Sequence, residues 1–175
     1  MTPFAMPVNA AATVPAAPGT PARPLDVVDR AWIASEKPDQ SSFSRRHPLT
    51  IEGEQIGAFE LTFLCAPDGA VAVAYNESRH LREGTNDRLS ALAIGSGKEH
   101  VLLNVQSSAP DLAGSELLSA ARNAVPPALL NALAETEGRS LVVATQTLAN
   151  TRTTIRPGNA GFAENLRRTI AACKK

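Results

Sequence analysis

The sequence predicts an α+β domain: an antiparallel β-sheet or sandwich of about six strands, a short mid-chain helix, and a C-terminal helix packed on the sheet. Three observations predict this class. Two pairs of apolar runs alternate with a period of two and enclose turn residues. Two further runs rich in β-branched residues follow. The final segment then has the apolar spacing of an amphipathic helix.

Length and composition favour one ordinary globular domain. The chain has 175 residues, of which 43% are hydrophobic and 19% charged, which is enough for a single core. Seventeen basic residues balance seventeen acidic ones, so no overall field attracts nucleic acid or an anionic membrane. No stretch reaches the roughly 18 uninterrupted apolar residues of a membrane span. We therefore expect neither a nucleic-acid partner nor a transmembrane segment.

Residues 1–25 differ in composition from the rest of the chain. They are rich in proline and alanine, and repeated proline removes backbone donors and fixes φ. The sequence predicts a disordered tract here and a single globular domain over 26–175. The tract lacks the basic start and unbroken apolar core of a signal peptide, so we expect that a signal peptide is absent from this chain.

The first hairpin is predicted over 53–77. Before it, Trp32 lies in a polar stretch that predicts no firm strand. From residue 53 the sequence GEQIGAFELTFLCA alternates, and one face carries Phe59, Leu61, Phe63 and Cys65. The turn residues PDG follow, and then the β-compatible run AVAVAYNE. These features indicate two antiparallel strands joined by a tight turn.

A second hairpin is predicted over 87–106, where two apolar runs flank the sequence GSG. The sequence GSGK also invites comparison with a phosphate-binding loop. That motif needs a glycine where Leu92 stands and a serine or threonine where Glu99 stands. The mismatch favours a hairpin turn.

The apolar period changes to about 3.6 between residues 109 and 138. The sequence PPALLNALAETEG, residues 126–138, begins with proline and ends with glycine, as short helices do. SLVVATQTL and TRTTIRP then predict two strands. The segment AGFAENLRRTIAAC, residues 160–173, predicts the C-terminal helix.

The two cysteines each fall on the apolar side of a predicted element. A helical projection places Cys173 with Phe162, Leu166 and Ile170, and Cys65 shares its face with aromatic residues. A CxxC redox motif is absent, and the three histidines have no metal-ligand spacing to either cysteine. A disulfide and two unpaired buried thiols both remain open, and a disulfide would place the protein in an oxidising compartment.

Catalytic residues are not indicated by any motif. The chain has no GxSxG elbow, and the order of its Ser, His and Asp residues singles out no triad. Within 76–87, His80 with Glu83, or Glu77 with Glu83, has the chemistry of an acid and a base. We interpret this segment as a solvated polar loop. No metal site or cofactor is expected.

Basic residues form the remaining candidate site. They occur in two short runs, which contribute the candidate anion or partner contacts Arg45, Arg46, Arg79, His80 and Arg82. If the fold gathered them, their forked donors would suit a phosphate, a carboxylate or an acidic surface. The alternative interpretation is scattered, solvated charge, which the zero net charge favours.

The order of these features resembles a known class of small domains. It comprises Trp32, a strand ending in LTFLC, two hairpins, a short helix, the strands GRSLVVATQ and TTIRP, and the segment GFAENLRRTIAAC. It resembles two-cysteine periplasmic domains of Gram-negative bacteria, including type VI secretion-associated periplasmic proteins and, more loosely, invasion-associated locus B-like proteins. The resemblance implies a Cys65–Cys173 disulfide and brings no catalytic residues. The chain departs from the pattern at residues 157–159.

We therefore expect a periplasmic or secreted, non-enzymatic binding or envelope-accessory module that contacts another envelope protein. The alternative is a small hydrolase or transferase with its site in 76–87.

Overall fold

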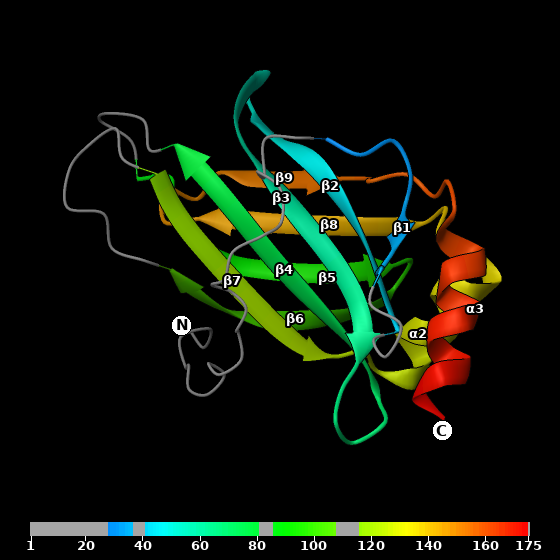
Figure 1. The fold of residues 1–175 in the computed structure, drawn as a ribbon. Coiled ribbons are helices and arrows are strands. Elements are labelled where there is room, and N and C mark those ends of the chain that lie inside the picture. The colour runs from blue at the N-terminus through cyan, green and yellow to red at the C-terminus, as the bar shows by residue number, and fades with distance from the viewer. Residues whose placement is uncertain (1–27, 37–40, 81–85, 108–115, 175) are drawn as a thin grey trace.

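The computed structural model describes residues 28–36, 41–80, 86–107 and 116–174. The predicted disordered tract, residues 1–25, lies outside these ranges. Within these ranges, nine strands form one antiparallel sheet, which curls into a half-barrel with two helices at one end (Figure 1). The predicted mostly antiparallel architecture with a mid-chain and a C-terminal helix is confirmed, but the sheet has nine strands instead of about six.

The strands are β1 (Ile33–Ala34), β2 (Ser42–Ile51), β3 (Glu54–Cys65), β4 (Val71–His80), β5 (Leu89–Ser96), β6 (Glu99–Ser107), β7 (Glu116–Ala124), β8 (Leu141–Thr147) and β9 (Arg152–Ile155). The helices are α2 (Pro127–Glu135) and α3 (Phe162–Cys173). The order across the sheet is β1-β2-β3-β4-β7-β6-β5-β8-β9. β5 therefore does not lie beside β4, although it follows β4 in sequence. The two positions between β4 and β5 are occupied by β7 and β6, which form later in the chain.

Both predicted hairpins are present. β3 pairs with β4 from Cys65 opposite Val71 to Gly57 opposite Arg79. β5 and β6 meet at a turn in which Gly97 has a φ of 64°, a conformation that glycine adopts without strain. The GSGK sequence is thus a hairpin turn, as the mismatch with the phosphate-loop motif predicts.

Three of the nine strands were not predicted. β1, with two residues, lies beside Trp32 in the stretch that predicts no firm strand. β2 occupies a stretch interpreted as polar, and β7, with the sequence ELLSAARNA, lies where a helical period was predicted. β7 pairs with β4 on one side and β6 on the other, and its Leu117 and Ala121 are buried. Such pairing outweighs the intrinsic helix preference of alanine and leucine.

Residues 76–80 also differ from the prediction, because they continue β4 instead of forming a polar loop. Every second side chain of this strand faces the interior of the curled sheet. Within this row Glu77 and Arg79 are fully buried and pair with each other. The pairing offsets most of the desolvation free energy that a single buried charge would cost.

The helices close one end of the half-barrel. The ring of Phe162 in α3 packs against Trp32, Phe43 and Phe63, with ring centroids 5.1–5.5 Å apart. Gly138 allows this contact, because a Cβ atom built there would lie 2.4 Å from the Phe162 ring. No helix in the described ranges is long and apolar enough to cross a membrane.

Candidate functional site

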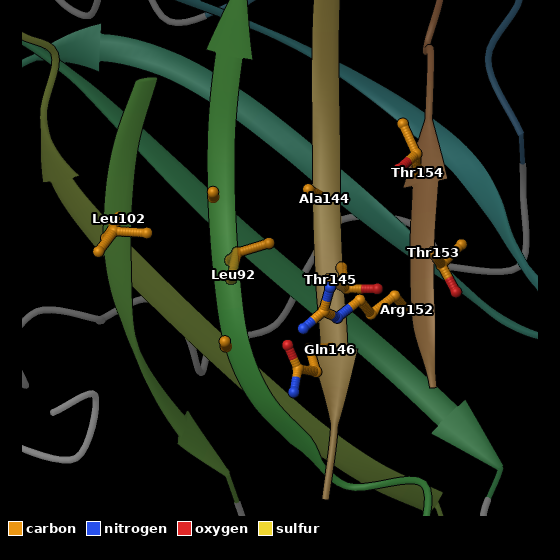
Figure 2. Close-up of a pocket in the computed structure, with 10 residues that line it drawn as sticks. Leu92, Leu102, Ala144, Thr145, Gln146, Arg152, Thr153 and Thr154 are labelled. Atoms are coloured by element: carbon orange, nitrogen blue, oxygen red, sulfur yellow. The ribbon is translucent and has the colours of Figure 1, made fainter. Parts of the chain in front are cut away.

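A shallow groove lies on the outer face of the sheet, over β6, β5, β8 and β9 (Figure 2). Its volume is about 350 Å³. The lining residues are Ala91, Leu92, Ala93, Leu102, Ala144, Thr145, Gln146, Arg152, Thr153 and Thr154. The groove opens broadly to solvent, so it suits a few side chains of a partner better than an enclosed small molecule.

Strand register explains why the groove exists. Ala93 lies opposite Leu102 of β6 and opposite Ala144 of β8, and Ala144 lies opposite Thr154 of β9. Two alanines therefore stand between two larger side chains in one row across four strands. Because alanine fills little space above the pleated surface, the row is hollow at its centre. We call this feature the alanine groove.

The neighbouring row gives the alanine groove a polar side. Ala91 lies opposite Gln146, and Gln146 lies opposite Arg152. The Gln146 amide donates to Asn150 Oδ1 at 3.1 Å. Arg152 is exposed and forms no ion pair or side-chain hydrogen bond with any described residue. One rim is thus apolar, at the half-exposed Leu102, and the opposite rim carries a guanidinium group.

The interior of the half-barrel holds a second polar group, which we call the Tyr-Glu-Arg cluster: Tyr75, Glu77 and Arg79. Arg79 donates to both carboxylate oxygens of Glu77, at 2.6 and 2.9 Å, and the Tyr75 hydroxyl donates to Oε1 at 2.6 Å. Burial, with the adjacent Glu77 carboxylate, raises the pKa of Tyr75 well above 10.

The cluster is closed to solvent, and its side chains are hydrogen-bonded within the fold. Arg79 also donates to the backbone oxygen of Asp87 at 2.6 Å, which ties the segment before β5 to β4. All three side chains are at most 1% exposed. This arrangement favours a structural role, because neither the carboxylate nor the guanidinium is open to a ligand.

The basic candidates from the sequence do not converge. Arg45 donates to the backbone oxygens of Asp29 and Pro157. Arg46 lies on the opposite side of β2, buried near the carboxylates of Asp29 at 3.8 Å and Glu60 at 3.6 Å. Arg79 belongs to the interior cluster. His80 is exposed at the end of β4, and Arg82 lies outside the described residues.

The acid and base candidates of 76–87 are also separated. Glu77 is committed to Arg79, and neighbouring positions along a strand face opposite sides, so exposed His80 does not share a site with Arg79 or Glu77. Glu83 lies outside the described residues. Among the residues that the structure describes, no group of three or more His, Cys, Asp or Glu is placed to hold a metal ion.

One histidine has a perturbed environment. His47 is half-buried on β2, with its ring centroid 5.5 Å from that of Phe59. Burial lowers the pKa of His47 below 6.5, and nearby Arg45 lowers it further. The ring is therefore mostly neutral at neutral pH, which suits a packed side chain.

The cysteine pair is a disulfide. Cys65 at the end of β3 is bonded to Cys173 at the end of α3, with the Cα atoms 5.3 Å apart and a sequence separation of 108. The sequence alone left both a disulfide and two unpaired thiols open, and the structure contains the disulfide. The bond fixes the terminal helix to the hairpin that contains the first predicted core strand.

Comparisons with protein-family models, with curated proteins and with solved structures gave no match. The residues themselves therefore supply the evidence for a function. Of the features described above, the alanine groove is the one that combines exposure, a defined shape and an unpaired charge at its rim. Sequence reasoning missed it, although alanine at positions 91, 93 and 144, on the solvent side of alternating strands, was a readable signal.

Proposed function

We propose that this domain is a non-enzymatic binding module of the bacterial envelope, which acts in the periplasm or outside the cell and contacts another protein through the alanine groove. The observation that carries the proposal is the hollow that Ala93 and Ala144 leave between Leu102 and Thr154 on the outer face of the sheet. Apolar hollows with polar rims are typical of protein contact sites.

Three further observations support this proposal. The disulfide is of the kind that persists in oxidising compartments. The buried ionic groups, Glu77 with Arg79 and Arg46 with its two carboxylates, are engaged within the fold. The exposed apolar residues include Leu102, at the groove, and Leu118, also on the outer face of the sheet. A rigid scaffold with adaptable outer positions is a common basis for recognition.

A photo-reactive side chain placed at Ala144 tests the proposal in cells that export the chain. We expect a specific cross-linked partner at Ala144 that is lost when Ala93→Trp fills the alanine groove. The control for the probe places the same group at Ala120 on β7, an outer-face alanine of similar burial outside the groove. The control for the block combines the Ala144 probe with Ala120→Trp, which should leave the cross-link in place. Equal cross-linking from both sites, or none from Ala144, would overturn the proposal.

A further inference from the structure

The free edge of β9 differs from the opposite edge of the sheet in how open it is to another strand. At the opposite edge, β1 covers only Phe43 and Ser44 of β2, and Asp29 then binds the backbone N–H and C=O of Arg46. Beyond that point β2 carries Pro48, which has no N–H, and a register shift between Leu49 and Thr50. Such features prevent strand addition. Within Arg152–Ile155, β9 has none of them.

The hydrogen-bond pattern defines which β9 groups are available. Thr147 N–H donates to Thr151 O at 3.0 Å, so these two residues form a hydrogen-bonded pair at the hairpin turn. Bonded and non-bonded pairs alternate along an antiparallel ladder. Thr153 and Ile155 therefore bond to β8, whereas the backbone groups of Arg152 and Thr154 point away from the sheet. No described strand pairs with this edge.

The side chains of β9 define the chemistry of a matching strand. Exposed and half-buried residues alternate from Arg152 to Arg156, which directly follows the last residue of β9. Both arginines are exposed, and neither forms an ion pair with any described residue. Four strand residues span roughly 13 Å. The other face carries Thr153 and Ile155, which are half-buried, and Ile155 packs against the core. A complementary strand would be acidic on its outer face and apolar on its inner face.

A second copy of this chain is a poor occupant of the same edge. Antiparallel pairing of two β9 strands would bring arginines of one copy beside arginines of the other. Like charges on paired strands destabilise the pair. The charge pattern therefore favours a different chain with carboxylates at alternate positions.

We propose that β9 binds an extended, acidic-apolar segment of a partner protein by strand addition, with carboxylates beside Arg152 and Arg156 and backbone hydrogen bonds to Arg152 and Thr154. This inference rests on the proposed binding function and specifies the partner's chemistry. Thr153, Thr154 and Arg152 also line the alanine groove, so the added strand would lie along the rim of that surface. Main-chain bonds would supply affinity and the alternating side chains would supply selectivity.

The test uses a capped peptide of alternating Glu and Val, seven residues long, whose binding to the full chain is measured by calorimetry. We expect saturable binding that weakens by about tenfold in Arg152→Glu/Arg156→Glu, because two attractive cross-strand pairs become repulsive. The matched control, Arg167→Glu/Arg168→Glu, makes the same charge change on the exposed side of α3 and should leave binding unchanged.

Two further measurements separate strand addition from charge attraction alone. A peptide that carries N-methyl groups on its pairing amides keeps its charge but loses its donors, and we expect its binding to fall by at least about tenfold. Thr154→Pro removes one outward N–H from β9 without removing a bond to β8 and should weaken the unmodified peptide. Equal binding of the methylated peptide, or equal losses in the α3 control, would overturn the inference.

The same data distinguish this inference from the proposed function. If groove cross-links at Ala144 persist while the peptide results fail, the binding function stands and the acidic strand is wrong. If the cross-links fail but the peptide binds as expected, the contact site is the β9 edge, and the alanine groove is not the partner's docking surface.

Discussion

The two ends of the half-barrel stabilise the fold with different chemistry. At the helix end, four aromatic rings from four segments pack together with centroids 5.1–5.8 Å apart, and the Cys65–Cys173 bond holds α3 beside them. β4 runs away from the helices toward the opposite end (Figure 1), where the Tyr-Glu-Arg cluster is buried in the interior. The helix end is apolar and covalently fastened, while the opposite end adds a buried ion pair to its apolar side chains.

This difference predicts different responses to substitution. Aromatic packing is distributed over many weak contacts, so losing one part leaves the others in place. In a buried ion pair, by contrast, the loss of either partner leaves the other charge buried without a counter-charge, which strongly destabilises the fold. We therefore expect the charged end to be the less tolerant of the two.

The largest expected effect is that of Arg79→Met. The substitution roughly preserves volume but leaves the Glu77 carboxylate buried without its cation, at a cost of about 3–5 kcal/mol in the free energy of unfolding. Urea unfolding followed by far-ultraviolet circular dichroism measures it. The double variant Glu77→Leu/Arg79→Met should lose less than the single one. A single-variant loss under about 1 kcal/mol would contradict the contrast between the two ends.

The next effect concerns the helix end. Cys65→Ser/Cys173→Ser should lower the free energy of unfolding by about 2–4 kcal/mol, because the bond closes a long loop. Hydrogen exchange should rise mainly in α3, while β4 near Arg79 stays protected. Trp32 is the only tryptophan and packs against Phe162, so its fluorescence reports on this end alone. A uniform rise in exchange along the chain would show instead that the two ends unfold together.

The sequence predicted the elements whose patterns are local. Both hairpins, α2, α3 and the cysteine faces follow from alternation, turn residues and helical spacing within short windows. β2 was missed because its centre is the polar run Arg45, Arg46, His47, whose partners include the distant Pro157 carbonyl. β7 was missed because only pairing with β4 and β6 makes its alanine-rich sequence extended.

The candidate sites depend on strand order, which the sequence did not supply. Ala93 and Ala144 become neighbours only because β5 lies beside β8, and the β9 edge is free only because β9 comes last in the sheet. The interior cluster left a clearer signal, since Tyr75, Glu77 and Arg79 occupy alternate positions and therefore share one face of a strand. Such spacing within a β-rich run can indicate a buried pair instead of a solvated loop.

The smallest effect is that of Tyr75→Phe, which separates the hydrogen bond from ring packing at the charged end. The ring stack with Phe59 remains, but Glu77 loses one donor, so we expect the free energy of unfolding to fall by about 1–2 kcal/mol at neutral pH.

Because the pKa of Tyr75 is raised in the folded protein, the contribution of Tyr75 to stability is present below about pH 10 and is lost as pH rises further. The natural chain should therefore lose stability above about pH 10, and Tyr75→Phe should lack this slope. Tyr75 is the only tyrosine, so near-ultraviolet absorbance follows its ionisation directly. Ionisation of the folded chain at the same pH as the urea-unfolded chain would contradict the burial of this cluster.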